Sequence, residues 1–147
     1  MNCGARSYRW LLEQEGISLT LESARDACRT TNMGTREPDL RAAFQMHSFD
    51  VELRQNLSWD EFKSLCSSHY LVVIYQCHYS VAVAADDLGV DLYDPDYDAV
   101  VRRAREDFEP VWRDYEIDLD WTRRDYERAA ILVRRLNGQP LDAIAAK

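Results

Sequence analysis

Three residues far apart in the sequence have the side-chain types of a nucleophilic catalyst. Cys3 offers a thiol, His78 offers a base that can take up its proton, and Asp94 offers a carboxylate that can hold the imidazole in one orientation. The segment Asn2-Cys3-Gly4 opens a predicted helix, whose dipole and unpaired amides favour a thiolate at its N-terminus. The Cys3 backbone N–H is also the obvious donor for an oxyanion. These residues point to acyl transfer through a cysteine.

Strands are expected to position the imidazole and the carboxylate, because the residues around them are apolar, β-branched or aromatic. The predicted strands are Tyr70–Tyr75, His78–Ala85 and Val90–Tyr93, the last of them ended by Pro95. The turn Asp86-Asp87-Leu88-Gly89 permits two pairing registers, and a shift by one residue moves a side chain to the other face of the sheet. Whether His78 and Asp94 share a face therefore stays open, with Asp96 as the alternative carboxylate.

Helices are expected before and after these strands in the sequence. The predicted helices of the first half are Cys3–Glu15, Leu21–Arg29 with Thr20 as its cap, one that follows Pro38, and a short one opened by a Ser58–Glu61 capping box, with a short strand at Phe49–Leu53. Further helical turns are predicted around Phe108, Val111 and Trp112. Thr122–Leu136 is predicted as a helix with Tyr126, Ala129, Ala130, Val133 and Leu136 on its inner face, ended by Gly138 and Pro140 and followed by a frayed tail at residues 141–147.

This order of elements predicts an α+β fold, with N-terminal helices packed on a small antiparallel sheet and an extra C-terminal helix. Its length of 147 residues is that of a single domain, so residues 1–147 are expected to share one hydrophobic core.

Composition and charge disfavour several classes of protein. The net charge of −8 argues against a nucleic-acid binder, which needs a basic face for phosphates, and against an anionic membrane surface as partner. Apolar runs stay well short of the roughly 18 residues of a membrane span, so none is expected. The four cysteines have no regular spacing, which favours a reduced, cytoplasmic protein over a disulfide framework. No cofactor is expected.

Zinc is the metal for which the sequence offers a candidate set of ligands. Cys66-Ser67-Ser68-His69 followed by Cys77-His78 resembles the spacing of zinc ligands. Adjacent residues of a strand point to opposite faces, however, so Cys77 and His78 are poorly placed to bind one ion. Cys28 and Cys66 lie on the inner faces of predicted helices and are expected in the core. We therefore predict no metal site.

Several short motifs, in this order, resemble one known family. They are Cys3-Gly4 at the start of a helix, the Gly34-Thr35 loop, His78-Tyr79-Ser80-Val81, the strand Gly89–Pro95 that ends in Asp94-Pro95, and the segment Phe108–Trp112. Together they look like the bacteriocin-processing peptidases, papain-like cysteine peptidases that cut after double-glycine leaders, over roughly residues 2–112. The resemblance implies a papain-like fold with the active site between the helices and the sheet. It also implies Cys3 as nucleophile, His78 as general base and Asp94 as the orienting group.

Residues 113–147 then form a C-terminal helical extension of the family-like core at residues 2–112. The family usually carries a Gln about six residues before the Cys, as a donor to the oxyanion, whereas only Met1 and Asn2 precede Cys3 here. Either the chain is trimmed or the donor is lost, and such a loss typically costs about 100- to 1000-fold in rate. Asn2 is a poor substitute, since a neighbour of the nucleophile rarely points the right way.

The predicted function is a cysteine peptidase-type hydrolase that cleaves a peptide or amide bond, with a leader peptidase as the more specific expectation. The partner is then a peptide or protein substrate. Two alternatives stay open. A deamidase or acyltransferase effector could use the same triad, and a catalytically weak peptide-binding module could share the same fold.

Overall fold

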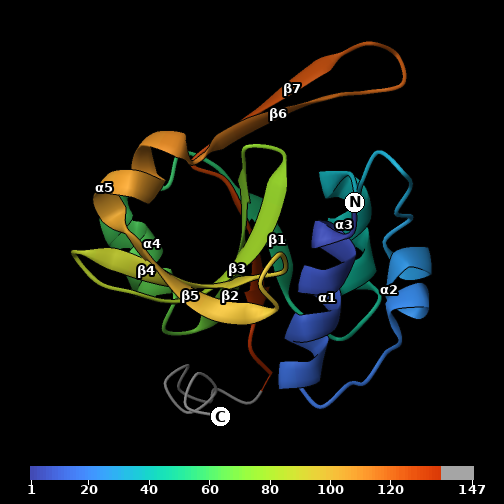
Figure 1. Ribbon diagram of the computed structural model, residues 1–147, viewed down its shortest axis with the longest axis horizontal. Helices are drawn as coiled ribbons and strands as arrows, with labels where there is room; N and C mark the ends of the chain where they lie inside the picture. Colours follow the sequence, from blue (N-terminus) through green and yellow to red (C-terminus); the bar gives the residue numbers. More distant parts are fainter. Residues whose placement is uncertain (137–147) are drawn as a thin grey trace.

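The computed structural model describes residues 1–136 and contains a large antiparallel sheet with helices on both of its faces (Figure 1). The helices are α1 (Cys3–Gln14), α2 (Leu21–Ala27), α3 (Glu37–Gln45), α4 (Trp59–Leu65) and α5 (Arg105–Phe108), the last continued by a 3-10 turn, η1 (Glu109–Val111). The strands are β1 (Val51–Arg54), β2 (His69–Tyr75), β3 (His78–Ala85), β4 (Gly89–Asp94), β5 (Ala99–Ala104), β6 (Arg113–Ile117), β7 (Arg123–Glu127) and β8 (Ala130–Arg134). The order in the six-stranded sheet is β1-β8-β2-β3-β4-β5, and β6 and β7 form a separate two-stranded ribbon.

Helices α1, α2 and α3 lie on one side of the sheet, and α4 and α5 lie on the other (Figure 1). The apolar side chains that α1 buries recur at helical spacing and are Ala5, Tyr8, Leu11 and Leu12. Thr20 caps α2, and Ser58 and Glu61 form the predicted capping box of α4. The α+β fold with N-terminal helices on an antiparallel sheet is therefore confirmed. No helix within residues 1–136 combines the length and apolar character needed to cross a bilayer.

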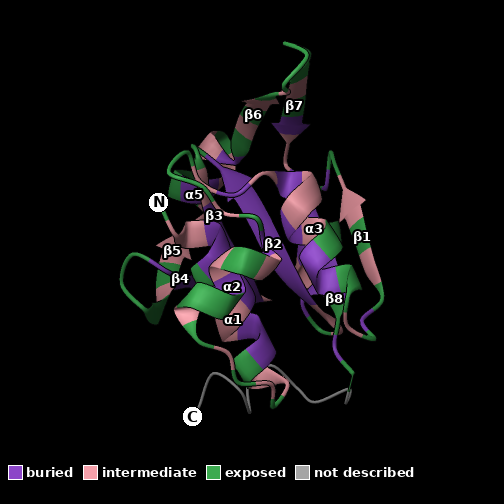
Figure 2. Cartoon of the chain, turned by 90° about the vertical axis from the view of Figure 1, so that its right-hand side faces the viewer, coloured by how far each residue is buried: buried purple, intermediate pink, exposed green. Residues whose placement is uncertain are grey.

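The centre of the sheet is buried on both faces. All of β2 after His69 is buried, as are the first four residues of β8, and β2 runs purple through the middle of the molecule (Figure 2). These strands are continuous apolar runs, which is the pattern of strands covered by helices on both sides. The sheet that carries the candidate residues is thus a rigid part of the core.

The helix predicted over Thr122–Leu136 is wrong. This segment forms β7 and β8, and Arg128 between them has a left-handed φ of 43°. The apolar residues that suggested a helical face belong mainly to an unbroken run, Ala129–Val133, which is buried because β8 lies between β1 and β2. A short apolar run fits a buried strand and a buried helix equally well. Residues 137–147, with the predicted helix end and tail, lie outside the described residues.

The segment before β7 was predicted only in part. The helical turns expected around Phe108 and Trp112 are present as α5 and η1, but strands β5 and β6 on either side of them were not expected. Strand β5 has no buried residue and lies at the edge of the sheet, so it lacks the apolar alternation that marks a half-buried strand.

Candidate active site

Cys3 is the first residue of α1 and is partly exposed. The first bond within the helix runs from the Arg6 N–H to the Asn2 carbonyl at 2.8 Å, so the Cys3 N–H precedes the helical ladder and can serve another acceptor. The next residue must be small, because a Cβ on Gly4 would lie 2.7 Å from the Thr35 Cβ. Thr35, in the loop before α3, therefore packs against the residue that follows Cys3 and limits where the start of α1 can lie.

His78 begins β3 immediately after a two-residue turn. Tyr75 and His78 are paired across this turn, and the Tyr75 ring stands perpendicular to the imidazole with ring centroids 5.4 Å apart. The imidazole is mostly buried, with 17% of its side chain exposed. The Tyr75 ring and this burial thus restrict the position of the imidazole.

Asp94 binds the imidazole from the end of β4. The His78 Nε2 and the Asp94 Oδ1 lie 3.0 Å apart, and the Asp96 N–H donates to the same oxygen at 3.0 Å. The Asp96 carboxylate lies 4.0 Å from Nε2 and is largely exposed, so the structure favours Asp94 over this alternative. With Nε2 turned to Asp94, the other ring nitrogen is the one available to the Cys3 thiol.

A β-bulge puts His78 and Asp94 on the same face of the sheet. Near the turn, Ala85 pairs with Val90, but beyond the irregularity at Ala82–Ala84 the pairing shifts by one residue, so that Val81 faces Tyr93. In the unshifted register, His78 and Asp94 would point to opposite faces. The one extra residue in β3 is therefore a condition for their contact.

The contacts of the imidazole change its protonation. Burial lowers the pKa of His78, but hydrogen bonds with Cys3 and Asp94, together with their charges, raise it from 6.5 to about 9. The raised pKa favours the imidazolium form of His78 at neutral pH. The structure thus brings the three predicted residues together: Asp94 binds the His78 imidazole, and Cys3 lies close enough to raise its pKa. This arrangement is suited to nucleophilic attack on a carbonyl.

Tyr79 connects strand β3 to α1 and to the loop before α3, close to the three candidate residues. Its hydroxyl donates to the Thr35 carbonyl at 2.9 Å, and the Ser7 hydroxyl of α1 donates to the Tyr79 carbonyl at 3.4 Å. Sequence reasoning used Tyr79 only as part of a motif. The available signal for the contact between Tyr79 and the Thr35 loop was a tyrosine next to the histidine on a buried strand.

The structure also shows where Asn2 and the two predicted core cysteines lie. The Arg25 guanidinium donates to the Asn2 side-chain oxygen, which ties this residue to α2. Cys28 and Cys66 are buried, as predicted. Among residues 1–136, the side chains that converge closely enough for a metal ion are His78, Asp94 and Asp96, and the zinc-like cysteines are not among them.

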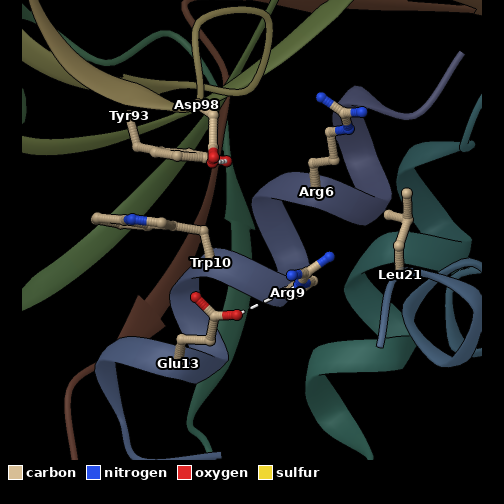
Figure 3. A pocket seen from close by; sticks show the side chains of 7 residues that line it. All are labelled: Arg6, Arg9, Trp10, Glu13, Leu21, Tyr93 and Asp98. Carbon is tan, nitrogen blue, oxygen red and sulfur yellow. Dashed lines mark hydrogen bonds and ion pairs between the residues drawn. The ribbon is translucent and has the colours of Figure 1, made fainter. Parts of the chain in front are cut away.

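Two hollows flank the site. One of about 420 Å³ lies beside the imidazole, where Gln76, Cys77, Tyr97 and Arg103 are among its lining residues. A second of about 240 Å³ runs along α1 (Figure 3), where the Trp10 ring stacks on Tyr93 with centroids 4.5 Å apart. Arg6, on the wall of the second hollow, donates to the Pro95 carbonyl at 3.3 Å, next to Asp94.

A thiol on the first turn of a helix, opposite a histidine and a carboxylate on an antiparallel sheet, is the arrangement of a papain-like cysteine peptidase. The sequence agrees with this class: residues 1–121 match the peptidase C39 family, and the chain belongs to that family. No curated protein sequence matches the chain.

Three solved structures with a similar fold are peptidase or protease domains of transporters. The peptidase domain of Streptococcus ComA, a bifunctional ABC transporter involved in a quorum-sensing pathway, is similar with a TM-score of 0.69 and 17% identity, over 90% of each chain. A double-glycine-motif protease from an AMS/PCAT transporter, in complex with the leader peptide, has a TM-score of 0.71 and 14% identity, over 91% of this chain and 84% of that one. The peptidase domain of Streptococcus mutans ComA has a TM-score of 0.54 and 16% identity, over 74% and 82%. The predicted resemblance and the papain-like fold are thereby confirmed.

Proposed function

We propose that this protein is a cysteine peptidase that cleaves a peptide bond with Cys3 as nucleophile, His78 as acid and base, and Asp94 as the orienting group. The observation that carries the proposal is the imidazole itself. Its Nε2 lies 3.0 Å from the Asp94 carboxylate, and both Asp94 and Cys3 raise its pKa. Such a pair can hold a thiolate ready beside its proton donor.

The chemistry follows in two steps. The Cys3 thiolate attacks the substrate carbonyl and forms a C–S bond, while the Cys3 N–H at the start of α1 faces the developing oxyanion. The His78 imidazolium gives its proton to the leaving amine, and the C–N bond breaks to leave a thioester. Neutral His78 then takes a proton from water, which attacks the thioester and releases the carboxylic acid and Cys3.

We further propose a leader peptide as the substrate. Family membership and the structural neighbour in complex with a leader peptide support this class, with small residues before the cut. A reducing, cytoplasmic location suits the proposal, because the four cysteines are all free and the nucleophile must stay reduced.

Mass spectrometry of a leader-like peptide, incubated with wild type and with Cys3→Ala, tests the function. We expect wild type to cleave after the small residues and Cys3→Ala to have no turnover, with an unchanged far-UV circular dichroism spectrum. Release of ammonia without cleavage would instead identify a deamidase. Binding of the peptide by both proteins without any reaction would identify a binding module. Cleavage that persists in Cys3→Ala would exclude Cys3 as the nucleophile.

A further inference from the structure

The turn that presents His78 has an unfavourable backbone for its residues. Gln76 and Cys77 form the two-residue connection between β2 and β3, and their φ angles are 48° and 59°. Tight hairpins with two left-handed residues strongly prefer Asn and Gly at these positions, and neither residue is present here. Since L side chains crowd the backbone in this region, contacts from elsewhere must support the turn.

Strand β6 supplies these contacts. The Gln76 N–H donates to the Arg113 carbonyl at 3.0 Å, and the Cys77 N–H donates to the Asp114 Oδ2 at 2.7 Å. Both amides of the strained turn are thus satisfied by consecutive residues at the start of the β6–β7 ribbon. Asp114 binds the residue directly before His78, although it does not touch the imidazole in any described contact.

The same face of β6 also reaches the helical half of the molecule. Two residues beyond Asp114, the Glu116 carboxylate accepts the Glu37 N–H at 3.0 Å through Oε2 and the Tyr126 hydroxyl at 2.6 Å through Oε1. Glu37 begins α3, two residues after Thr35, which packs against Gly4 beside the nucleophile. The ribbon accordingly extends from the β2–β3 turn toward α3 (Figure 1).

We propose that Asp114 is a positioning residue for His78. By holding the Cys77 amide, it fixes the turn from which the imidazole projects toward Cys3, and β6 thereby braces the sheet half of the site against the helical half. Asp114 itself contacts no reacting atom. This inference rests on the proposed function, since it assigns Asp114 a part in the reaction of Cys3 and His78.

Three variants separate positioning from charge. Asp114→Ala removes the acceptor of the Cys77 N–H, whereas Asp114→Asn removes the charge and keeps one oxygen. Asp125→Ala is the matched control, because Asp125 lies on the same ribbon but on its outer face, where it is exposed and paired with Arg123 at 2.7 Å. Circular dichroism establishes that each variant is folded.

We expect Asp114→Ala to lower kcat by roughly 10- to 100-fold with little change in KM, because small misplacements of a catalytic group have effects of this size. Asp114→Asn should stay within about fivefold of wild type, the equivalent of one weakened hydrogen bond. Asp125→Ala should match wild type. NMR titration should show that the pKa of His78 falls from about 9 in Asp114→Ala, as the imidazole loses its alignment with Cys3 and Asp94, but not in Asp114→Asn.

A second thiol reports on the contact itself. The charge of Asp114, followed by burial, raises the pKa of Cys77. Both Asp114→Ala and Asp114→Asn should therefore speed alkylation of Cys77 at neutral pH, as resolved by mass spectrometry, whereas only Asp114→Ala should lower kcat. If Asp114→Ala does not fold, Asp114→Glu displaces the same charge by one methylene and should lower kcat in its place.

Wild-type kcat and unchanged His78 titration in a folded Asp114→Ala would overturn the proposal, as would an equal loss of kcat in Asp125→Ala. The test does not depend on finding a substrate. If wild type cleaves no peptide, the proposed function fails, but the titration of His78 in Asp114→Ala still decides whether Asp114 positions the imidazole.

Discussion

Replacing Cys3 by Ala should lower the pKa of His78, and the size of the effect follows from the contacts of the ring. Burial lowers the pKa of His78, yet the hydrogen bonds and charges of Cys3 and Asp94 raise it from 6.5 to about 9. This rise corresponds to about 3 kcal/mol in favour of the imidazolium. Without the thiol, burial is opposed mainly by Asp94 alone, so the pKa of His78 in Cys3→Ala should lie well below that of wild type.

NMR titration of the imidazole protons measures this effect. The chain has three histidines, and His78→Ala assigns the signal of interest. His69 is the internal reference, because burial and then the charge of Arg134 lower its pKa and it lies at the opposite end of β2 from the site. A wild-type His78 that titrates near its ordinary value, or a pKa that is the same in Cys3→Ala, would refute the arrangement described here.

Three further predictions concern the surroundings of the triad. Gly4→Ala should lower both Tm and kcat, because the new Cβ would lie 2.7 Å from the Thr35 Cβ and overpacking costs about 1–3 kcal/mol. Thermal melts and peptide turnover measure the two effects, and an unchanged Tm would contradict the prediction. Asn2→Ala should reduce the cleavage rate by much less than the roughly 100-fold expected for a lost oxyanion donor, because Arg25 binds the Asn2 side chain. A roughly 100-fold loss in initial rates would instead assign Asn2 to the oxyanion site. Finally, the contribution of His78 to the free energy of unfolding should be full below pH 6.5 and decline as the pH rises through about 9, since the folded-state pKa is raised. Urea unfolding across this pH range should show the decline in wild type, whereas His78→Ala should not show it.

The parts of the fold that could be predicted from the sequence are those set by local chemistry. The Ser58–Glu61 capping box opens α4 because its two side chains satisfy amides of the same helical turn. Likewise, β3 runs over His78–Ala85 as predicted, because a run of small, apolar and β-branched residues follows the turn. The candidate triad could be predicted from residue types and a family resemblance, and its three side chains do lie together.

The features that sequence reasoning missed depend on distant partners. The bulge at Ala82–Ala84 decides whether His78 meets Asp94, yet no residue there marks it as irregular. The apolar run Ala129–Val133 was misread as helical, because only its insertion between β1 and β2 makes it a strand. Asp114 was missed for the same reason: its role comes from a turn 37 residues earlier in the chain.

The place of β8 between β1 and β2 has a consequence for how the protein folds during synthesis. Strand β1 pairs with β8 alone, and β8 also pairs with one edge of β2. Until residues near 130–134 have been synthesised, β1 therefore has no partner and β2 lacks its second one. Before that point, a nascent chain exposes two unpaired strand edges, which invite pairing with other chains. The sheet must therefore close late, through contacts of long sequence separation that slow folding. A fragment that stops at residue 112 or 121 would retain the triad residues but leave this gap in the sheet open, so it should aggregate rather than form a minimal peptidase.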